Sequence, residues 1–135
     1  MSAASCARIQ TGVPLLVVSA EDQDHYHLSA IMGRDCDVYR AATRQESASL
    51  LRLNRPWVVV CDDVLPDGDW RDLLDDLRTG EHTAPLIVSS RLADDRLWAE
   101  VLNLGGYDLL VKPFTAVEVS RVVEMAARRA CKAGV

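Results

Sequence analysis

The chain has 135 residues, enough for one domain with a substantial core but too few for two independent cores. About half of the residues are apolar and about a quarter are charged, as is typical of globular proteins. A formal charge of −5 argues against nucleic acid as a partner, because phosphate binding needs clustered basic residues. The longest apolar run, Val13–Val18, is too short to span a membrane, and the N-terminus lacks the features of a signal peptide. We therefore expect a cytoplasmic protein without a membrane partner.

Hydrophobic periodicity divides most of the chain into five repeats of a strand followed by a helix. Residues 1–12 lack such a period and are expected to form a flexible lead-in to a domain at 13–131, with 132–135 as a tail. The predicted strands are short, largely apolar runs at Pro14–Val18, Asp37–Ala41, Trp57–Cys61, Leu86–Ser89 and Asp108–Val111. The predicted helices lie at Asp22–Met32, with Asp22 as N-cap, and at Thr43–Leu53, Trp70–Arg78, Asp94–Leu104 and Thr115–Cys131. This alternation predicts a doubly wound α/β fold, a parallel sheet with helices on both faces.

Three polar side chains follow neighbouring strands of this sheet. Sheets of this kind place their functional groups at the carboxyl ends of the strands, where the chain has Asp62, Ser90 and Lys112. A carboxylate, a hydroxyl and an ammonium group suit the holding of a phosphoryl group on an aspartate. Asp62 would be the nucleophile, Ser90 would hydrogen-bond a phosphoryl oxygen, and Lys112 would pair with the negative charge. Because the apolar run stops at Asp62, we expect its carboxylate to project from the sheet edge rather than to be buried.

These residues make the chain resemble the receiver domains of two-component response regulators, from Leu15 to about Arg129. The resemblance is carried by the order and spacing of Pro56–Asp62, Val64–Pro66, Pro85–Ser90 and Gly105–Phe114. It implies a flavodoxin-like fold whose five-stranded parallel sheet has the order 2-1-3-4-5, with a cis bond before Pro113. The family thus implies a cytoplasmic, non-enzymatic module of a phosphorelay.

The same resemblance assigns further roles. Asp62 becomes the phosphoacceptor and, with the backbone carbonyl of Val64, a ligand of Mg²⁺. Ser90 and Leu109 take the switch positions. The partners implied are a histidine kinase, an output protein or both, which would bind through the fourth helix, the fifth strand and the fifth helix. Trp98 on the fourth helix is either part of that surface or core, and a homodimer is left open.

The chain departs from the family pattern where the metal should bind. Receivers usually end their first strand with two acidic residues, but Ser19 and Ala20 stand there, and Glu21 and Asp22 come directly after. With Asp62 as the only correctly placed acid, we expect weak Mg²⁺ binding. Leu109 also replaces the aromatic residue that is common at its position.

Two neighbouring features have competing explanations. Trp70 replaces a usual glycine and either leans over the pocket or covers the end of its helix. The run His25-Tyr26-His27 is expected to be solvent-exposed, because adjacent helical residues point in different directions and cannot converge on one ion.

The leading hypothesis is therefore an atypical receiver that acts by protein–protein interaction. The alternative is a working phospho-receiver in which Glu21 or Asp22 supplies the metal carboxylate. A remote alternative is a phosphatase with an aspartyl nucleophile. Such enzymes place a second aspartate two residues after the first, where this chain has Val64.

Overall fold

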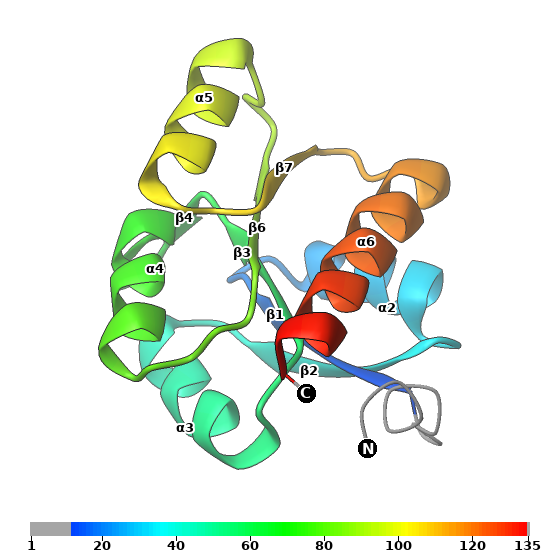
Figure 1. The fold of residues 1–135 in the computed structure, drawn as a ribbon. Coiled ribbons are helices and arrows are strands. Elements are labelled where there is room, and N and C mark those ends of the chain that lie inside the picture. Colours follow the sequence, from blue (N-terminus) through cyan, green and yellow to red (C-terminus); the bar gives the residue numbers. More distant parts are fainter. Residues whose placement is uncertain (1–11, 135) are drawn as a thin grey trace.

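The computed structural model describes residues 12–134, so the expected lead-in lies outside the described residues except for Gly12. Its main feature is one five-stranded sheet, formed by β1 (Val13–Val18), β2 (Cys36–Ala41), β3 (Val58–Asp62), β6 (Leu86–Ser90) and β7 (Asp108–Val111). The strands are ordered β2-β1-β3-β6-β7, and every neighbouring pair is parallel (Figure 1). The predicted fold and its 2-1-3-4-5 order are confirmed.

Helices cover both faces of the sheet: α2 (Asp22–Met32), α3 (Arg44–Asn54), α4 (Trp70–Thr79), α5 (Asp95–Leu104) and α6 (Ala116–Gly134). In Figure 1, α2 and α6 lie on one face, and α3, α4 and α5 lie on the other. Each face has its own apolar cluster. Leu28 and Val122 belong to the first, and Leu51, Leu77 and Val101 to the second. None of the helices within the described residues is long and apolar enough to cross a membrane.

Two predicted helix starts differ by one residue because a side chain caps the helix. Thr43 and Asp94, expected inside their helices, are N-caps whose side chains accept hydrogen bonds from the amides of Glu46 and Leu97. Asp22, expected as an N-cap, is instead the first helical residue, because Glu21 takes the N-cap position without a side-chain cap.

The C-terminal helix is longer than expected. Helix α6 runs to Gly134, so residues 132–134, expected to be a tail, lie within its end. The predicted end was set by the apolar stripe, and this stripe stops before the helix itself ends.

The loop after β3 contains a second, small sheet that periodicity did not indicate. Strands β4 (Val64–Leu65) and β5 (Gly68–Asp69) pair in antiparallel fashion and are joined by Pro66 and Asp67. Two-residue strands are too short to show an alternating pattern. The pair leads the chain from the end of β3 into the capping box of α4, where Asp69 and Asp72 bond each other's backbone amides.

Candidate functional site

The predicted strand-end residues meet at one edge of the sheet. The register pairs Asp62 with Ser89 and Ser90 with Val111, which brings Ser90 and Lys112 to the strand ends beside Asp62. Lys112 Nζ donates to Asp62 Oδ1 at 2.9 Å. The Ser90 hydroxyl instead donates to Asp63 Oδ2 at 2.8 Å. The sequence therefore located the site, but did not indicate that Asp63 engages Ser90.

Asp62 is buried, with 6% of its surface exposed, which corrects the expectation that its carboxylate projects into solvent. The reason is that residues from other elements lie over it. Lys112, the residue after β7, covers it and is itself bonded to a second buried acid, Asp24 of α2. The place of Asp62 at the end of an apolar run in the sequence therefore did not predict whether its side chain is exposed.

Asp24 is the site residue that sequence reasoning missed. Its Oδ2 accepts hydrogen bonds from Lys112 Nζ at 2.9 Å and from the Ser19 hydroxyl at 2.7 Å. The same hydroxyl accepts the amide of Glu21 at 3.0 Å. Ser19, one of the two positions where the acidic pair is missing, thus orients an acid supplied five residues later. The sequence did contain an indication of its position. Asp24 precedes Leu28 by four residues, so the two side chains lie on the same, buried face of the helix.

Glu21 and Asp22, the two alternatives for a metal carboxylate, lie in different places. Oxygens of Glu21, Asp24 and Asp62 all lie within 4.8 Å of one another, and we call these three residues the acidic cluster. Asp22 points outward, with 96% of its side chain exposed, and pairs with Arg40. Ala20 is exposed and contributes no carboxylate.

His25 is buried, which corrects its expected solvent exposure. Its Nε2 lies 2.7 Å from the carbonyl oxygen of Ser19, and only 3% of the residue is exposed. Its neighbour Tyr26 is exposed. Adjacent helical residues do point in different directions, as argued from the sequence, but one of those directions is the core.

The cluster carries more negative than positive charge. Burial raises the pKa of Asp62, and the nearby Asp24 charge adds to this, against the opposing effect of Lys112. Burial by itself would lower the pKa of Lys112, but its hydrogen bonds to Asp24 and Asp62 outweigh burial and raise it. The pKa of Glu21 is lowered to about 2, chiefly by its hydrogen bonds to Arg91. Lys112 therefore stays protonated, and ionised Asp62 is under electrostatic strain.

The donor set fits a magnesium ion. Mg²⁺ prefers oxygen ligands and is commonly held by one or two carboxylates together with waters. Asp24 and Asp62 offer buried carboxylates, and Glu21 adds a half-buried one. Val64, whose carbonyl is the further predicted ligand, lies in β4 with an exposed side chain.

One oxygen of Asp62 remains available for chemistry. Oδ1 accepts both Lys112 Nζ and the Asp63 amide, at 2.9 and 3.0 Å. Oδ2 accepts neither of these two hydrogen bonds. An oxygen without a donor keeps its lone pairs for attack on an electrophile.

Replacing Asp62 by Asn should stabilise the fold. Asn keeps the shape and an acceptor for Lys112 but removes one buried negative charge, so we expect a gain on the order of 1 kcal/mol near neutral pH. A carboxyl whose folded pKa is raised disfavours folding when it ionises. The gain should therefore be complete above the raised pKa and vanish below the carboxyl's ordinary value of 3.8. Urea unfolding at several pH values would measure it.

The matched control for that measurement is Asp22→Asn, which removes the same charge from an exposed position. We expect its free energy of unfolding to stay within about 0.5 kcal/mol of the wild type. Equal stabilisation by both variants would contradict the assignment of strain to the acidic cluster.

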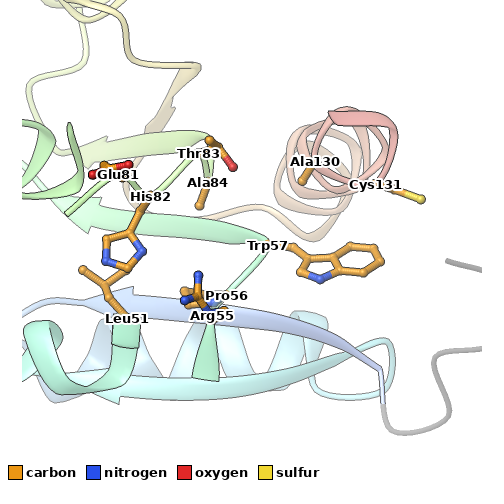
Figure 2. A pocket seen from close by; sticks show the side chains of 10 residues that line it. All are labelled: Leu51, Arg55, Pro56, Trp57, Glu81, His82, Thr83, Ala84, Ala130 and Cys131. Atoms are coloured by element: carbon orange, nitrogen blue, oxygen red, sulfur yellow. The ribbon is translucent and has the colours of Figure 1, made fainter. Parts of the chain in front are cut away.

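A separate cavity of about 270 Å³ lies at the other end of the sheet (Figure 2). Trp57 and Ala84, which precede β3 and β6, line it together with Ala130 of α6. None of its ten lining residues is a predicted site residue. The cavity is therefore not part of the strand-end site.

The surface expected to bind partners carries several exposed apolar side chains. Trp98 of α5 is 48% exposed, and its Nε1 donates to Asp108 Oδ1 at 3.2 Å. Val111 on β7 is also exposed, whereas Leu109 is half-buried and packs against the α4 side of the core. Trp98 is thus mainly a surface residue, and Leu109 contacts the core.

Comparisons with known proteins agree with this geometry. The family model for the response regulator receiver domain matches residues 27–124. The chain is 34% identical over 99 residues to the probable transcriptional regulator ycf27 of Porphyridium aerugineum, covering 72% of the chain and 40% of that protein. It is 31% identical over 101 residues to the KDP operon transcriptional regulatory protein KdpE of Escherichia coli, covering 75% and 44%. The chain thus spans less than half the length of either relative.

A solved structure shares both the fold and some sequence. The Francisella response regulator 1452 receiver domain superposes with a TM-score of 0.77 at 27% identity, covering 87% of this chain and 98% of that one. The family match begins at residue 27, so Ser19, Glu21 and Asp24 precede the matched span. The departure at the metal-binding end of β1 therefore lies outside the matched span, whereas Trp70 and Leu109 lie within it.

Proposed function

Because the chain belongs to the family of response regulator receiver domains, we propose that it is a signalling module in which Asp62 accepts a phosphoryl group. The observation that carries the proposal is the position of Lys112 Nζ at the carboxyl ends of the parallel strands, 2.9 Å from Asp62 Oδ1 and 2.9 Å from Asp24 Oδ2 of α2. Receiver domains are generally signalling modules rather than enzymes, and the proposal keeps that role. A cytoplasmic location remains a prediction.

The transfer would be a displacement at phosphorus. Oδ2 of Asp62 attacks the phosphoryl group of the donor, an O–P bond forms, and the bond between phosphorus and the donor's leaving group breaks. Lys112 would pair with the phosphoryl charge, and Ser90 would turn its hydroxyl from Asp63 to a phosphoryl oxygen. At about 4 Å and an effective dielectric near 20, one such charge pair is worth roughly 4 kcal/mol before desolvation.

Mg²⁺ would be held by Asp62 and Asp24, with Glu21 and the Val64 carbonyl as further candidates. Bound there, the ion would neutralise charge on the phosphoryl oxygens. We propose that its affinity is low, as the sequence led us to expect. The support is that Lys112 already uses oxygens of Asp24 and Asp62, so a metal must compete with a buried ammonium group.

The proposed partners are a histidine kinase and an output protein. The supporting observation for their docking surface is the exposed Trp98 beside Asp108 and Val111, on α5 and β7. The choice between monomer and homodimer remains open.

Intact mass spectrometry after incubation with acetyl phosphate would test the proposal. We expect a single phosphoryl adduct that requires Mg²⁺ and is absent from Asp62→Asn. Asp24→Asn should slow the reaction about tenfold or more at limiting Mg²⁺, because it removes a buried carboxylate of the metal set, whereas Asp22→Asn should react like the wild type.

Two outcomes would count against the proposal. An adduct that persists in Asp62→Asn would exclude this residue as the acceptor. No adduct at saturating Mg²⁺ would favour a phosphorylation-independent binding module on the same fold.

A further inference from the structure

The carboxylate of Glu21 is held by a cation that no predicted role uses. Arg91 directly follows Ser90 at the end of β6, and its guanidinium reaches across to Glu21 at the N-cap of α2. Nη1 lies 3.0 Å from Oε2 and Nη2 lies 2.6 Å from Oε1, a bidentate pair. Two elements 70 residues apart in the chain are thus joined beside Asp62.

This pair leaves Glu21 with little capacity for another cation. Arg91 engages both of its carboxylate oxygens, and Lys112 Nζ lies 3.6 Å from Oε2. A guanidinium cannot lose its proton in a protein, so the competition cannot be relieved by deprotonation. The lowered pKa of Glu21 agrees with a carboxylate already stabilised by positive charge.

We infer that Arg91 is an internal competitor of Mg²⁺ for Glu21, and that it lowers the affinity of the acidic cluster for the metal. The inference rests on the proposed function, since the metal is the one proposed there. To ligate Mg²⁺, Glu21 would have to leave Arg91. While Glu21 stays bound to Arg91, Asp24 and Asp62 are the carboxylates of the acidic cluster that a metal could use.

The exposure of the pair limits the size of the effect. The side chains of Arg91 and Glu21 are 60% and 36% exposed, and ion pairs at such positions are weak and screened by salt. We therefore expect Arg91→Gln to tighten Mg²⁺ binding about three- to fivefold at low ionic strength. The gain should shrink as salt is added.

The test is a titration of the whole chain with Mg²⁺. Isothermal calorimetry gives the dissociation constant, and the amide NMR shifts of α2 and of the end of β3 at Asp62 show where the ion binds. The control is Arg96→Gln, which removes the same charge from an exposed position five residues further on. It should change the dissociation constant less than about twofold. In a Glu21→Gln background, Arg91→Gln should lose its effect, because the residue over which the two cations compete is gone.

Equal affinities of Arg91→Gln and Arg96→Gln would overturn the inference. So would an undiminished gain in the Glu21→Gln background, which would mean that Arg91 acts by general repulsion. Absence of Mg²⁺ binding in every variant would overturn it as well. The acceptor role of Asp62 is decided separately, because the acetyl phosphate experiment measures the mass of the intact chain and compares it with that of Asp62→Asn.

Discussion

Replacing Lys112 by Met should cost about 3–5 kcal/mol of folding stability, the usual result of removing one partner from a buried ion pair. The Lys112 side chain is only 5% exposed and is the cation that contacts both buried acids, Asp24 and Asp62. Without it, the acidic cluster keeps three negative charges and only Arg91 as a counter-charge at Glu21. Urea unfolding followed by circular dichroism at pH 7 would measure the loss.

The loss should depend on pH in a defined direction. Lys112 lowers the pKa of Asp62 and of Glu21, so without it the folded-state pKa of each rises. Their protonation then favours the folded state, and the deficit shrinks as pH falls. The double variant Lys112→Met, Asp62→Asn should recover part of the stability, because it removes one of the unpaired charges. A loss of folding stability below about 1 kcal/mol that does not change with pH would contradict this prediction. It would mean that water, rather than Lys112, stabilises the charges of the acidic cluster.

Replacing Trp70 by Ala should cost about as much, roughly 3–5 kcal/mol, for a different reason. The sequence left open whether its indole leans over the pocket or covers a helix end. The structure places it in the apolar cluster between the sheet and α4, with 1% of its surface exposed. Truncation would leave a large cavity that the surrounding strands cannot close.

The matched control is Trp98→Ala, which removes the same side chain from a half-exposed position. Trp98 is 48% exposed, and its one polar contact is with Asp108. We expect its loss to cost about 1 kcal/mol or less. Chemical unfolding of the two variants under the same conditions would compare them, and similar costs would contradict the core assignment of Trp70.

The alternation of strands and helices could be predicted from periodicity, whereas the strand order 2-1-3-4-5 was implied by the family resemblance. Short apolar runs alternating with amphipathic segments allow few topologies, so the parallel sheet and the meeting of Asp62 with Lys112 followed from the order of elements. Helix starts were less certain, since Thr43 and Asp94 read equally well as first helical residues or as caps. Their role depends on a backbone angle that composition does not fix.

The acids around Asp62 were harder to predict, because side-chain direction decides their role. Glu21, Asp22 and Asp24 are close in sequence and similar in chemistry, yet two join the acidic cluster and Asp22 points to solvent. Asp24 lies on the buried face of its helix and Asp22 does not. To predict this difference from the sequence, the start of the helix must be known to within one residue. The Arg91–Glu21 and Ser90–Asp63 contacts have no sequence signal, since both depend on how loops close over the sheet.

The charge balance of the pocket also bears on how the chain assembles during synthesis. The acids Glu21, Asp24 and Asp62 all emerge in the first half of the chain, whereas both cations that offset them come later. Lys112 stands 88 residues after Asp24. A nascent chain that has formed β1, α2 and β3 therefore holds converging acids without either cation. Arg91 reaches Glu21 only once β6 has formed, and Lys112 reaches Asp24 and Asp62 only when the last strand docks. Contacts between residues so far apart in the chain form late and at a cost in chain entropy. We therefore expect the contacts of the acidic cluster to form cooperatively, when the final strand joins the sheet.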